Sequence, residues 1–354
     1  MAVNPQAFVD EQLKELIGKE IKSDYDLEGR VEAASIDVPI GARAYLVDND
    51  FLPFKHRVKD LVEEHAIKSY DLTKKTELHK GHTYLVELLD LDLAPHQSAR
   101  FSPKSSIGRV DLMVKSVIDG VGRNDYIPAG SKGSVWAKIK PQSFNVLLQE
   151  GMPLNQLRVF DETKESYCEI DPNEVLPGTY NPSSNLTTPP NKLSLSIGVP
   201  EGLVGYKAKH TNRFLDLTQI GVHEANDFFE EVHANNGVLQ LEKDAFYILA
   251  TRENISIPAR YSVEMEAINP EHGELRVHYA GFFDPGFGLP NPASGVLEVR
   301  AQENMPVFHG QPICDLKFHK NSQEPTELYG SGSSNYQGQK GPRLAKYIKP
   351  SKKQ

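Results

Sequence analysis

The chain has 354 residues, enough for two domains of about 150 residues each, and its 39% hydrophobic and 25% charged residues are ordinary for a globular protein. No apolar run approaches the roughly 18 residues of a membrane-spanning helix, and the N-terminal residues lack the pattern of a secretion signal. A net charge of −9 argues against a nucleic-acid partner, and two cysteines exclude a disulfide framework. We therefore expect a cytoplasmic protein that binds neither nucleic acid nor membrane.

Helical spacing of apolar residues occurs at three places along the chain. Asn4 followed by Pro5 is typical of a helix N-cap and first helical position, and the apolar spacing continues until Gly18. A second helix is expected around residues 58–64, and its counterpart around residues 222–232.

The chain contains two diverged copies of one unit. The run SIDVP at residues 35–39 returns as SIGVP at residues 196–200, which is 161 positions later. The run GMPLNQL at residues 151–157 returns as GQPICDL at residues 310–316, which is 159 positions later. Two landmarks in the same order and at nearly the same spacing predict a duplicated domain.

Short strands are expected in most of the remaining sequence. Apolar runs at residues 84–88, 135–139, 246–250 and 295–299 are separated by glycine and proline, which is typical of sandwiches and barrels. We expect a mainly β protein with a few helices (α+β). The expected division is a first domain at residues 1–170, a proline-rich linker at 171–192, a second domain at 193–328 and a C-terminal tail at 329–354.

Several common catalytic signatures are missing from the sequence. There is no glycine-rich phosphate loop, no dinucleotide fingerprint and no Gly-x-Ser-x-Gly turn. The two cysteines, Cys168 and Cys314, lie far apart, and the His-x-Glu and Pro-Cys-x-x-Cys signature of zinc deaminases is absent. We therefore expect no protein-bound metal.

The first copy contains a candidate anion-binding segment that runs from Lys104 to Arg109. The hydroxyls of Ser105 and Ser106, a glycine and a guanidinium suit a phosphate, because serine donates short hydrogen bonds and arginine forks onto two oxygens. The alternative is a polar turn before the strand expected at residues 110–114.

The second copy contains two carboxylates in unusual settings. Asp284 begins an Asp-Pro-Gly turn, where it either caps the turn or binds a ligand. Glu298 interrupts the apolar run at residues 296–299, and strand alternation allows it to face either solvent or the interior. A partly desolvated Glu298 would have a raised pKa, suited to taking a proton from water.

The C-terminal tail combines glycine, aromatic and basic residues, and it has no acidic residue after Glu327. It is either a solvated or disordered tail, or a mobile lid that closes on an anionic nucleotide and stacks a tyrosine on a ring or sugar. The residues concerned are Tyr329, Tyr336, Gln339, Lys340 and Arg343.

Together these motifs resemble the dCTP deaminase family of the trimeric dUTPase superfamily, over most of each copy. The resemblance implies two tandem dUTPase-like domains, each a distorted β-barrel or jelly roll. The matching positions are Ser105, Ser106 and Arg109; then Ala280, Asp284, Pro285, Gly286 and Phe287; then Glu298; then Gly310, Leu316 and Phe318; and finally Tyr329, Tyr336, Gln339 and Gly341.

Each copy lacks what the other retains. At the place of Glu298 the first copy has Lys138, and at the place of Ser105 and Ser106 the second copy has only residues 260–262. Family sites lie between subunits. The resemblance therefore implies one kind of composite site per chain, in a homo-oligomer whose repeats alternate around the site.

The resemblance also implies a reaction, the hydrolysis of dCTP to dUTP and ammonia in pyrimidine deoxynucleotide synthesis. Glu298 would activate the water that attacks C4 of cytosine, with Arg109 and Ser105 positioning that water. Main-chain groups near Ala280 would contact the pyrimidine edge, and Asp284 the deoxyribose 3′-hydroxyl. Mg²⁺ would accompany the triphosphate. The remaining substrate contacts implied are Ser106, Lys104, Phe287, Tyr329, Tyr336, Gln339, Lys340 and Arg343.

Departures from the family pattern leave other activities open. The expected tail lysine is Asn335, for which Lys340 or Arg343 would compensate, and the family's final Ser-Arg is Ala345-Lys346. The superfamily scaffold also cleaves phosphoanhydrides, so dUTP pyrophosphatase activity, alone or after deamination, is one alternative. A non-catalytic nucleotide sensor is another. Feedback by dTTP is expected only by family analogy.

Overall fold

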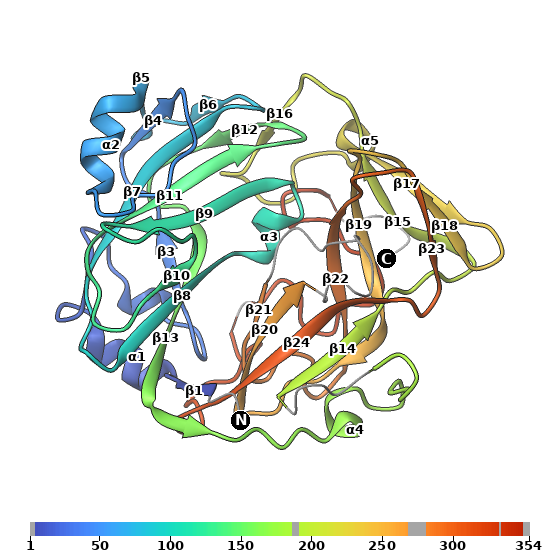
Figure 1. Cartoon of the computed structure of the whole chain (residues 1–354). Coiled ribbons are helices and arrows are strands. Elements are labelled where there is room, and N and C mark those ends of the chain that lie inside the picture. Colours follow the sequence, from blue (N-terminus) through green and yellow to red (C-terminus); the bar gives the residue numbers. More distant parts are fainter. Residues whose placement is uncertain (1–3, 186–190, 268–280, 333, 350–354) are drawn as a thin grey trace.

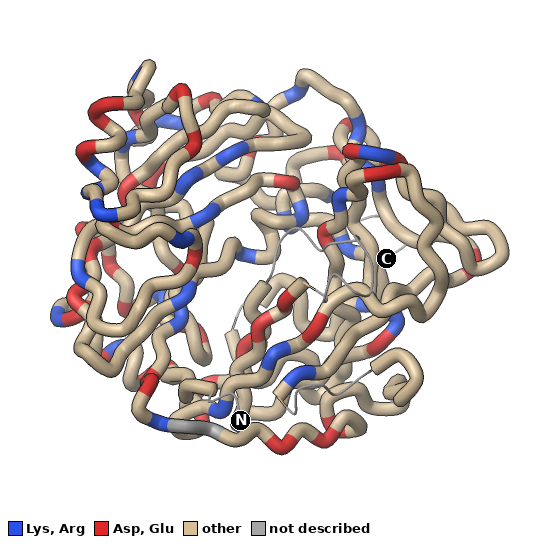
Figure 2. Tube along the Cα trace, viewed as in Figure 1, with Lys and Arg blue, Asp and Glu red and all other residues tan. Residues whose placement is uncertain are grey.

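The computed structural model describes residues 4–185, 191–267, 281–332 and 334–349, and these residues form mainly β-structure with short helices. Figure 1 shows two β-rich halves, the first in blue to green and the second in yellow to red. Basic and acidic residues are interspersed along both halves (Figure 2). None of the described helices is long and apolar enough to cross a membrane. The mainly β fold expected from the sequence is confirmed.

The first copy has two main sheets that share one buried core. One sheet has the strand order β1-β13-β8-β10 with β3 beside β13, and the other has the order β5-β4-β7-β11-β9 with β2 beside β7. The elements are β1 (Asn4–Ala7), α1 (Asp10–Leu16), β2 (Ile21–Lys22), η1 (Glu28–Arg30), β3 (Ile36–Pro39), β4 (Arg43–Val47), α2 (Val58–His65), β5 (Ala66–Asp71), β6 (Thr76–Leu78), β7 (Thr83–Asp92), β8 (Gln97–Pro103), α3 (Ser105–Gly108), β9 (Leu112–Ile118), β10 (Tyr126–Ile127), β11 (Lys132–Pro141), β12 (Asn145–Leu148) and β13 (Pro153–Ser166).

The second copy repeats this plan with two four-stranded sheets. Their strand orders are β14-β24-β20-β21 and β17-β15-β19-β22, and β18 pairs with β23. The elements are α4 (Pro172–Val175), β14 (Lys192–Ser196), β15 (Gly202–Ala208), β16 (Phe214–Asp216), α5 (Ala225–Phe228), β17 (Phe229–Ala234), β18 (Val238–Leu241), β19 (Phe246–Ile255), β20 (Tyr261–Ala267), β21 (Phe282–Phe283), β22 (Ala293–Arg300), β23 (Met305–Phe308) and β24 (Pro312–Lys320).

The two copies share one scheme of strand pairing, which confirms the duplication. The scheme extends to side chains: the Tyr84 hydroxyl accepts a hydrogen bond from the His79 N–H, and the Tyr247 hydroxyl accepts one from the Glu242 N–H. The four apolar runs expected as strands fall in β7, β11, β19 and β22. The corresponding strands are β3 and β14, β4 and β15, β5 and β17, β7 and β19, β8 and β20, β10 and β21, β11 and β22, and β13 and β24.

Backbone hydrogen bonds correct the register of one sequence landmark. Ile40 exchanges backbone hydrogen bonds with residues 151–152, and Ile197 does so with residues 310–311. Ile40 therefore corresponds to Ile197, so the match between residues 35–39 and 196–200 is wrong by four positions. Alternation in a β-strand has a period of two, so an even shift leaves the apolar pattern intact and a false match looks convincing.

The pairing scheme also corrects the expected counterpart of Ser105. Pro103 pairs with Asn155 in the first copy, and Ala267 pairs with Cys314 in the second. Since Asn155 and Cys314 correspond, the counterpart of Ser105 lies two residues after Ala267, outside the described residues. Residues 260–262 correspond instead to the start of β8.

Two of the expected helices differ from the structure. Asn4 and Pro5 lie in β1, which pairs with β13, and α1 begins only at Asp10. Pairing with the end of the long strand β13 satisfies the backbone of residues 4–7, and this overrides the local helix signal. In the second copy α5 is a single turn, because the chain from Phe229 onward pairs with β15 instead of continuing the helix. α2 forms where it was expected.

Shared β-structure and a shared core join the two copies. β12 pairs with β6 of its own copy and, in parallel, with β16 of the second copy. Phe144 packs edge-on against Phe228 and Phe229, with ring centroids 5.3 and 5.2 Å apart. The copies therefore form one continuous body rather than two units on a flexible hinge.

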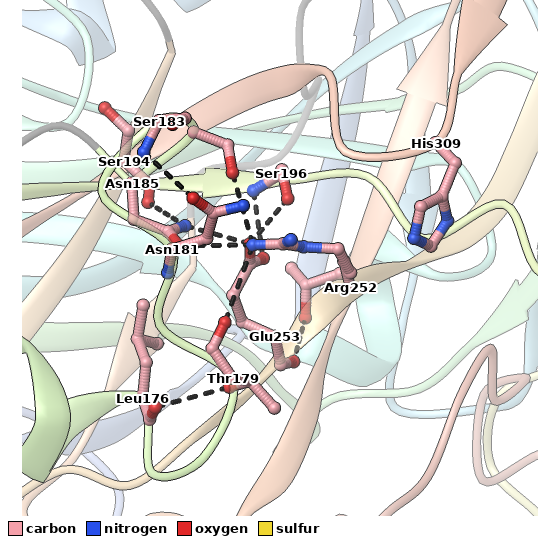
Figure 3. A network of polar contacts seen from close by, with 12 residues as sticks. Leu176, Thr179, Asn181, Ser183, Asn185, Ser194, Ser196, Arg252, Glu253 and His309 are labelled. Carbon is pink, nitrogen blue, oxygen red and sulfur yellow. Dashed lines mark hydrogen bonds and ion pairs between the residues drawn. The ribbon is translucent and has the colours of Figure 1, made fainter.

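The segment between the copies is anchored to the second copy over its described part. Asp171 is the N-cap of α4, and its carboxylate accepts a hydrogen bond from the Asn173 N–H. Figure 3 shows the fully buried carboxylate of Glu253, to which Asn185 and Arg252 each donate at 2.9 Å. This network ties residues 181–185 to strands β14 and β19.

Candidate active site

A cavity of about 330 Å³ lies between the two copies. The first copy contributes mainly residues 31–33, 103–106, 108 and 109, and the second contributes mainly residues 281–284, 287 and two residues of β22. The tail contributes residues from 327 to 346. The structure thus brings together in one chain most of the residues predicted from the sequence. Those that line the cavity are Lys104, Ser105, Ser106, Arg109, Asp284, Phe287, Glu298, Tyr329, Tyr336 and Gln339.

The one-turn helix α3 directs the first-copy segment into the cavity. Its hydrogen bonds run from the Gly108 N–H to the Lys104 carbonyl and from the Arg109 N–H to the Ser105 carbonyl, each at 3.1 Å. Ser106 is buried and Ser105 is exposed. The turn ends at Asp111, whose φ of 54° lies in the left-handed region that aspartate tolerates better than most residues.

Strand β22 presents Glu298 to the first copy, which decides between the two orientations left open by its sequence. Leu297 and Val299 point into the core of the second copy. Val296, on the opposite face, belongs to the core of the first copy. Glu298 shares the face of Val296 because alternate side chains of a strand point the same way.

Glu298 and Arg109 face each other across the junction of the copies. Arg109 Nε lies 3.9 Å from Glu298 Oε1, and both side chains are buried. Burial raises the pKa of Glu298 to about 7, although the charge of Arg109 opposes the rise. Arg109 Nε has no hydrogen-bond partner among the described residues. The pair therefore leaves a donor and a carboxylate available for a small polar molecule.

The tail holds the guanidinium of Arg109 in place. Arg109 Nη1 donates to Gln339 Oε1 at 3.1 Å and to the Arg343 carbonyl at 3.0 Å. The Tyr336 ring lies over the guanidinium, with Cζ 3.8 Å from the ring centroid. Tyr336 thus stacks on Arg109 in this structure, whereas the sequence suggested stacking on a nucleotide.

Asp284 is held by two residues of the first copy that the sequence analysis missed. Arg158 Nη2 donates to Asp284 Oδ1 at 2.7 Å, and Ser35 Oγ donates to Asp284 Oδ2 at 3.0 Å. Arg158 is fully buried and also donates to the carbonyls of Ala34 and Val263. A charged residue interrupting an apolar strand was the available signal, the same one that drew attention to Glu298.

Aromatic rings form one wall of the cavity. The Phe287 ring lies 5.0 Å from that of Phe283 and 5.7 Å from that of Tyr329, centroid to centroid. Burial raises the pKa of the Tyr329 hydroxyl, and the Asp284 carboxylate adds to the rise. Gly286 is required at the turn, because its φ is 95° and an added Cβ would lie 2.6 Å from Leu328 Cβ.

Basic and acidic groups meet around Lys104. Lys104 forms an ion pair with Asp37, and Lys346 also lines the cavity. Burial and the nearby charge of Lys104 lower the pKa of Lys346. Burial and the charge of Asp37 raise the pKa of Glu32. Lys346 was not among the predicted site residues. The two tail cations predicted to contact the substrate were Lys340 and Arg343.

Two predicted site residues in the described part of the chain, Lys340 and Arg343, are not among those that line the cavity. Lys340 Nζ donates to the Pro292 carbonyl at 2.6 Å and to Asn254 Oδ1 at 3.1 Å. Arg343 contributes its carbonyl to Arg109, while its guanidinium carbon lies 5.8 Å from the Tyr336 ring centroid. Ala280 lies outside the described residues.

The strand pairing places Lys138 at the position that corresponds to Glu298. Lys138 pairs with Leu85 in β7, and Glu298 pairs with Ile248 in the corresponding strand β19. Lys138 is buried, and its Nζ donates to Asp50 Oδ1 at 2.7 Å and to the Phe51 carbonyl at 3.2 Å. The position is thus occupied by a buried lysine whose amine is paired with the largely exposed carboxylate of Asp50.

The described part of the chain contains no group of three His, Cys, Asp or Glu side chains arranged to hold a metal ion.

Comparisons with known proteins identify the family of the chain. Residues 6–163 match the family model of the 2'-deoxycytidine 5'-triphosphate deaminase N-terminal domain, and residues 185–348 match that of its C-terminal domain. No curated protein sequence matches the chain significantly.

A solved structure supports the same assignment. The crystal structure of 2'-deoxycytidine 5'-triphosphate deaminase from Agrobacterium tumefaciens is similar, with a TM-score of 0.82 and 31% sequence identity. The similarity covers 91% of this chain and 99% of that chain, so it spans both copies and confirms the tandem architecture. The chain therefore belongs to the 2'-deoxycytidine 5'-triphosphate deaminase family.

Proposed function

We propose that this chain hydrolyses dCTP to dUTP and ammonia in the cavity between its two copies, as part of pyrimidine deoxynucleotide synthesis. The observation that carries the proposal is the buried pair of Arg109 and Glu298, with Arg109 Nε 3.9 Å from Glu298 Oε1. Family membership supplies the reaction class, and this pair supplies the chemistry that the reaction needs. Membership in the family does not by itself say which side chains carry out the reaction.

Glu298 has the properties of a general base that later acts as a general acid. With a pKa of about 7 it is ionised in about half of the molecules near neutral pH. A water that accepts from Arg109 Nε and donates to Glu298 fits between two atoms 3.9 Å apart. Glu298 takes a proton as the water oxygen bonds to C4 of cytosine. As the oxygen adds, the C4–N3 double bond opens and its electrons move to N3. The proton then passes from Glu298 to the exocyclic amino nitrogen, the double bond re-forms and ammonia leaves. The proton that remains on the C4 hydroxyl moves to N3, which gives the C4 carbonyl of dUTP.

The other residues of the cavity bind and orient the nucleotide. Asp284, fixed by Arg158, accepts from the deoxyribose 3′-hydroxyl, and the aromatic wall around Phe287 packs on the sugar. The segment that begins at Lys104 offers hydroxyls and cations to the phosphates. Lys346 takes the part that was expected of Lys340 or Arg343.

Mg²⁺ is proposed to enter with the triphosphate as part of the substrate. The cavity contains carboxylates as well as cations, so a bare triphosphate would meet repulsion that bound Mg²⁺ reduces. The cationic residues are Lys14, Lys104, Arg109 and Lys346, and the acidic ones are Asp10, Glu32, Asp284, Glu298 and Glu327. We propose that no protein-bound zinc takes part, so a zinc-selective chelator should leave the rate unchanged.

The proposal includes one catalytic centre per chain, built from both copies. Lys138 occupies the place of Glu298 in the first copy, and its amine is bound to Asp50. The counterpart of Ser105 lies outside the described residues, and Lys138 is the residue that distinguishes the first copy. Assembly into a homo-oligomer stays a prediction.

Product analysis tests the proposal directly. The wild-type chain is incubated with dCTP and Mg²⁺, and nucleotides, pyrophosphate and ammonia are measured. Equimolar dUTP and ammonia are expected. Formation of dUMP, pyrophosphate and ammonia would show deamination followed by pyrophosphatase activity, and a parallel incubation with dUTP would detect pyrophosphatase activity alone. Thermal stabilisation by dCTP or dTTP without any product would identify a nucleotide sensor.

The matched variant is Glu298→Gln, which keeps the size of the side chain and removes the base. It should retain the thermal shift that dCTP causes and lose about 10²–10⁴-fold in rate, the usual contribution of a general base. A full rate in this variant would show that another group activates the water.

A further inference from the structure

A second pair of charges lies two residues beyond the catalytic pair on both segments. Asp111 follows Arg109, and Arg300 follows Glu298, so the signs are exchanged between the copies. The side chains of Asp111 and Arg300 form an ion pair across the junction. The Asp111 side chain is fully buried, and that of Arg300 is 19% exposed. The two segments that carry the catalytic pair are thus joined by a second, independent contact.

Asp111 is fixed through its backbone as well as its carboxylate. Its N–H donates to the Gly108 carbonyl at 2.9 Å, and its carbonyl accepts from the Gln142 N–H at 3.1 Å. The Ser143 hydroxyl donates to the same carboxylate. Asp111 therefore sets the direction in which the chain leaves α3, and that direction fixes the backbone of Arg109.

Arg300 is also held by several hydrogen bonds, one of them to its own copy. It shares a strand face with Glu298, and residues two apart in a strand lie about 7 Å from each other. One end of its guanidinium donates to the carbonyl of Asp244 in its own copy, and the other end donates to Asp111 and, at 3.3 Å, to Ser143 Oγ. The planar guanidinium of Arg300 thus connects the strand that carries Glu298 to the turn that carries Arg109.

We propose that Asp111 and Arg300 are positioning residues, which set the distance and angle between Arg109 and Glu298 without touching the substrate. The proposal rests on the proposed function of the cavity. Neither residue lines the cavity. Arg109 and Glu298 belong to different copies, so only contacts across the junction hold them in register. A misplacement of about 1 Å at a reacting centre can cost about 10²-fold in rate.

The test removes both charges at once, in the variant Asp111→Asn/Arg300→Met. Removing both avoids the unpaired buried charge that a single change would leave, so the double variant is expected to fold. Asparagine also tolerates the left-handed backbone of position 111. Arg300→Lys keeps the positive charge but loses the two-ended guanidinium, and it should have a higher rate than the double variant. The matched control is Lys75→Met/Asp216→Asn, which removes another ion pair between the copies, at 2.6 Å, whose members do not line the cavity.

Two readouts separate positioning from a structural role. The first is kcat for dCTP, expected to fall about 10- to 100-fold in the double variant, with little change in KM and no such loss in the control. The second does not require turnover: the titration of the Glu298 carboxyl, followed by the infrared band that is absent from Glu298→Gln. In the wild type its midpoint should lie at about 7. It should rise in the double variant, because Arg109 moves away.

Few other groups affect the pKa of the Glu298 carboxyl. Among the described charged groups, Arg109 is the one that acts on Glu298, and the nearby Cys314 thiol has a pKa raised by burial and stays neutral. A double variant with the kcat and titration of the wild type would overturn the proposal, and so would one that loses thermal stability alone. If the wild type itself made no dUTP, the proposed function would fail, while the titration would still report whether the pair positions Arg109.

Discussion

Arg158 of the first copy and Asp284 of the second form a buried ion pair, with Arg158 Nη2 2.7 Å from Asp284 Oδ1. The turn that carries Asp284 is therefore shaped by a side chain from the other copy. Ser35 donates to the second carboxylate oxygen, so both oxygens are oriented before any ligand binds. Under the proposed function, this arrangement prepares Asp284 to accept a hydrogen bond from the sugar hydroxyl of the nucleotide.

Removal of Arg158 should affect both stability and substrate binding. Arg158→Met leaves the Asp284 carboxylate buried without its partner, which should lower the free energy of unfolding by about 3–5 kcal/mol. The KM for dCTP should rise, since the carboxylate is no longer oriented. Denaturant unfolding and steady-state kinetics measure the two effects. Arg158→Met/Asp284→Asn should recover much of the stability and none of the affinity; an equally unstable double variant would contradict the ion-pair explanation.

The reaction rate should depend on pH through Glu298. Its pKa of about 7 means that the base form disappears as the pH falls below that value. We expect kcat/KM for dCTP to fall about tenfold for each pH unit on the acidic side and to level off above about pH 8. A pH–rate profile with flat activity down to about pH 5.5 would exclude Glu298 as the titrating base.

The same carboxyl should make folding less favourable at higher pH. Its folded pKa of about 7 lies above its ordinary value of 4.5, so the folded state binds the proton more tightly than the unfolded state. Below about pH 4.5 both states are protonated, and the carboxyl has no effect on stability. Between pH 4.5 and 7 the wild type should lose up to about 3 kcal/mol relative to Glu298→Gln. Unfolding of both proteins across this range measures the difference, and parallel curves would contradict the raised pKa.

Tyr336 should act mainly through its ring. Tyr336→Phe keeps the ring over Arg109 and loses only a hydrogen bond that the hydroxyl accepts from the Lys346 N–H at 3.2 Å. Tyr336→Ala removes the stacking, worth about 0.5–2 kcal/mol, and frees the guanidinium to move. We expect a modest effect of the first change on kcat and a clear loss with the second. Equal losses in both variants would instead assign the role to the hydroxyl.

Lys138 should be dispensable for catalysis. Lys138→Met removes its ion pair with Asp50, which is largely exposed, so activity per chain should stay at the wild-type value. Lys138→Glu would place a carboxylate beside Asp50 at a buried position and should lower the melting temperature without adding activity. Active-site titration with a tight-binding nucleotide should give one site per chain in both variants. Two sites per chain in either variant would contradict a single composite site.

The sequence alone was enough to nominate the proposed reacting groups, because their chemistry is local. Glu298 interrupts an apolar strand, and Ser105, Ser106 and Arg109 form a compact motif, so short stretches of sequence are sufficient to find them. The structure adds the partners of these residues. Arg158 and Arg300 lie far along the chain from Asp284 and Asp111, and charge alone does not determine which carboxylate each arginine meets.

The fold was predicted better than its register. Apolar runs correctly indicated β7, β11, β19 and β22, and the duplication was real. The shift of four positions near Ile197 arose because an even shift preserves strand alternation. The start of α1 was missed because Pro5 takes part in a strand whose partner, β13, ends about 160 residues away. Contacts between distant segments decided both cases.

The buried end of the tail has a consequence for the order of events during synthesis. Ala345, Tyr347 and Ile348 belong to the core cluster of the first copy, although the ribosome makes them only after the whole second copy. The first copy therefore emerges with a gap in its interior that residues 345–348 fill later. A nascent chain that has not yet reached Tyr336 lacks the groups that hold the Arg109 guanidinium, so it does not contain the proposed catalytic centre.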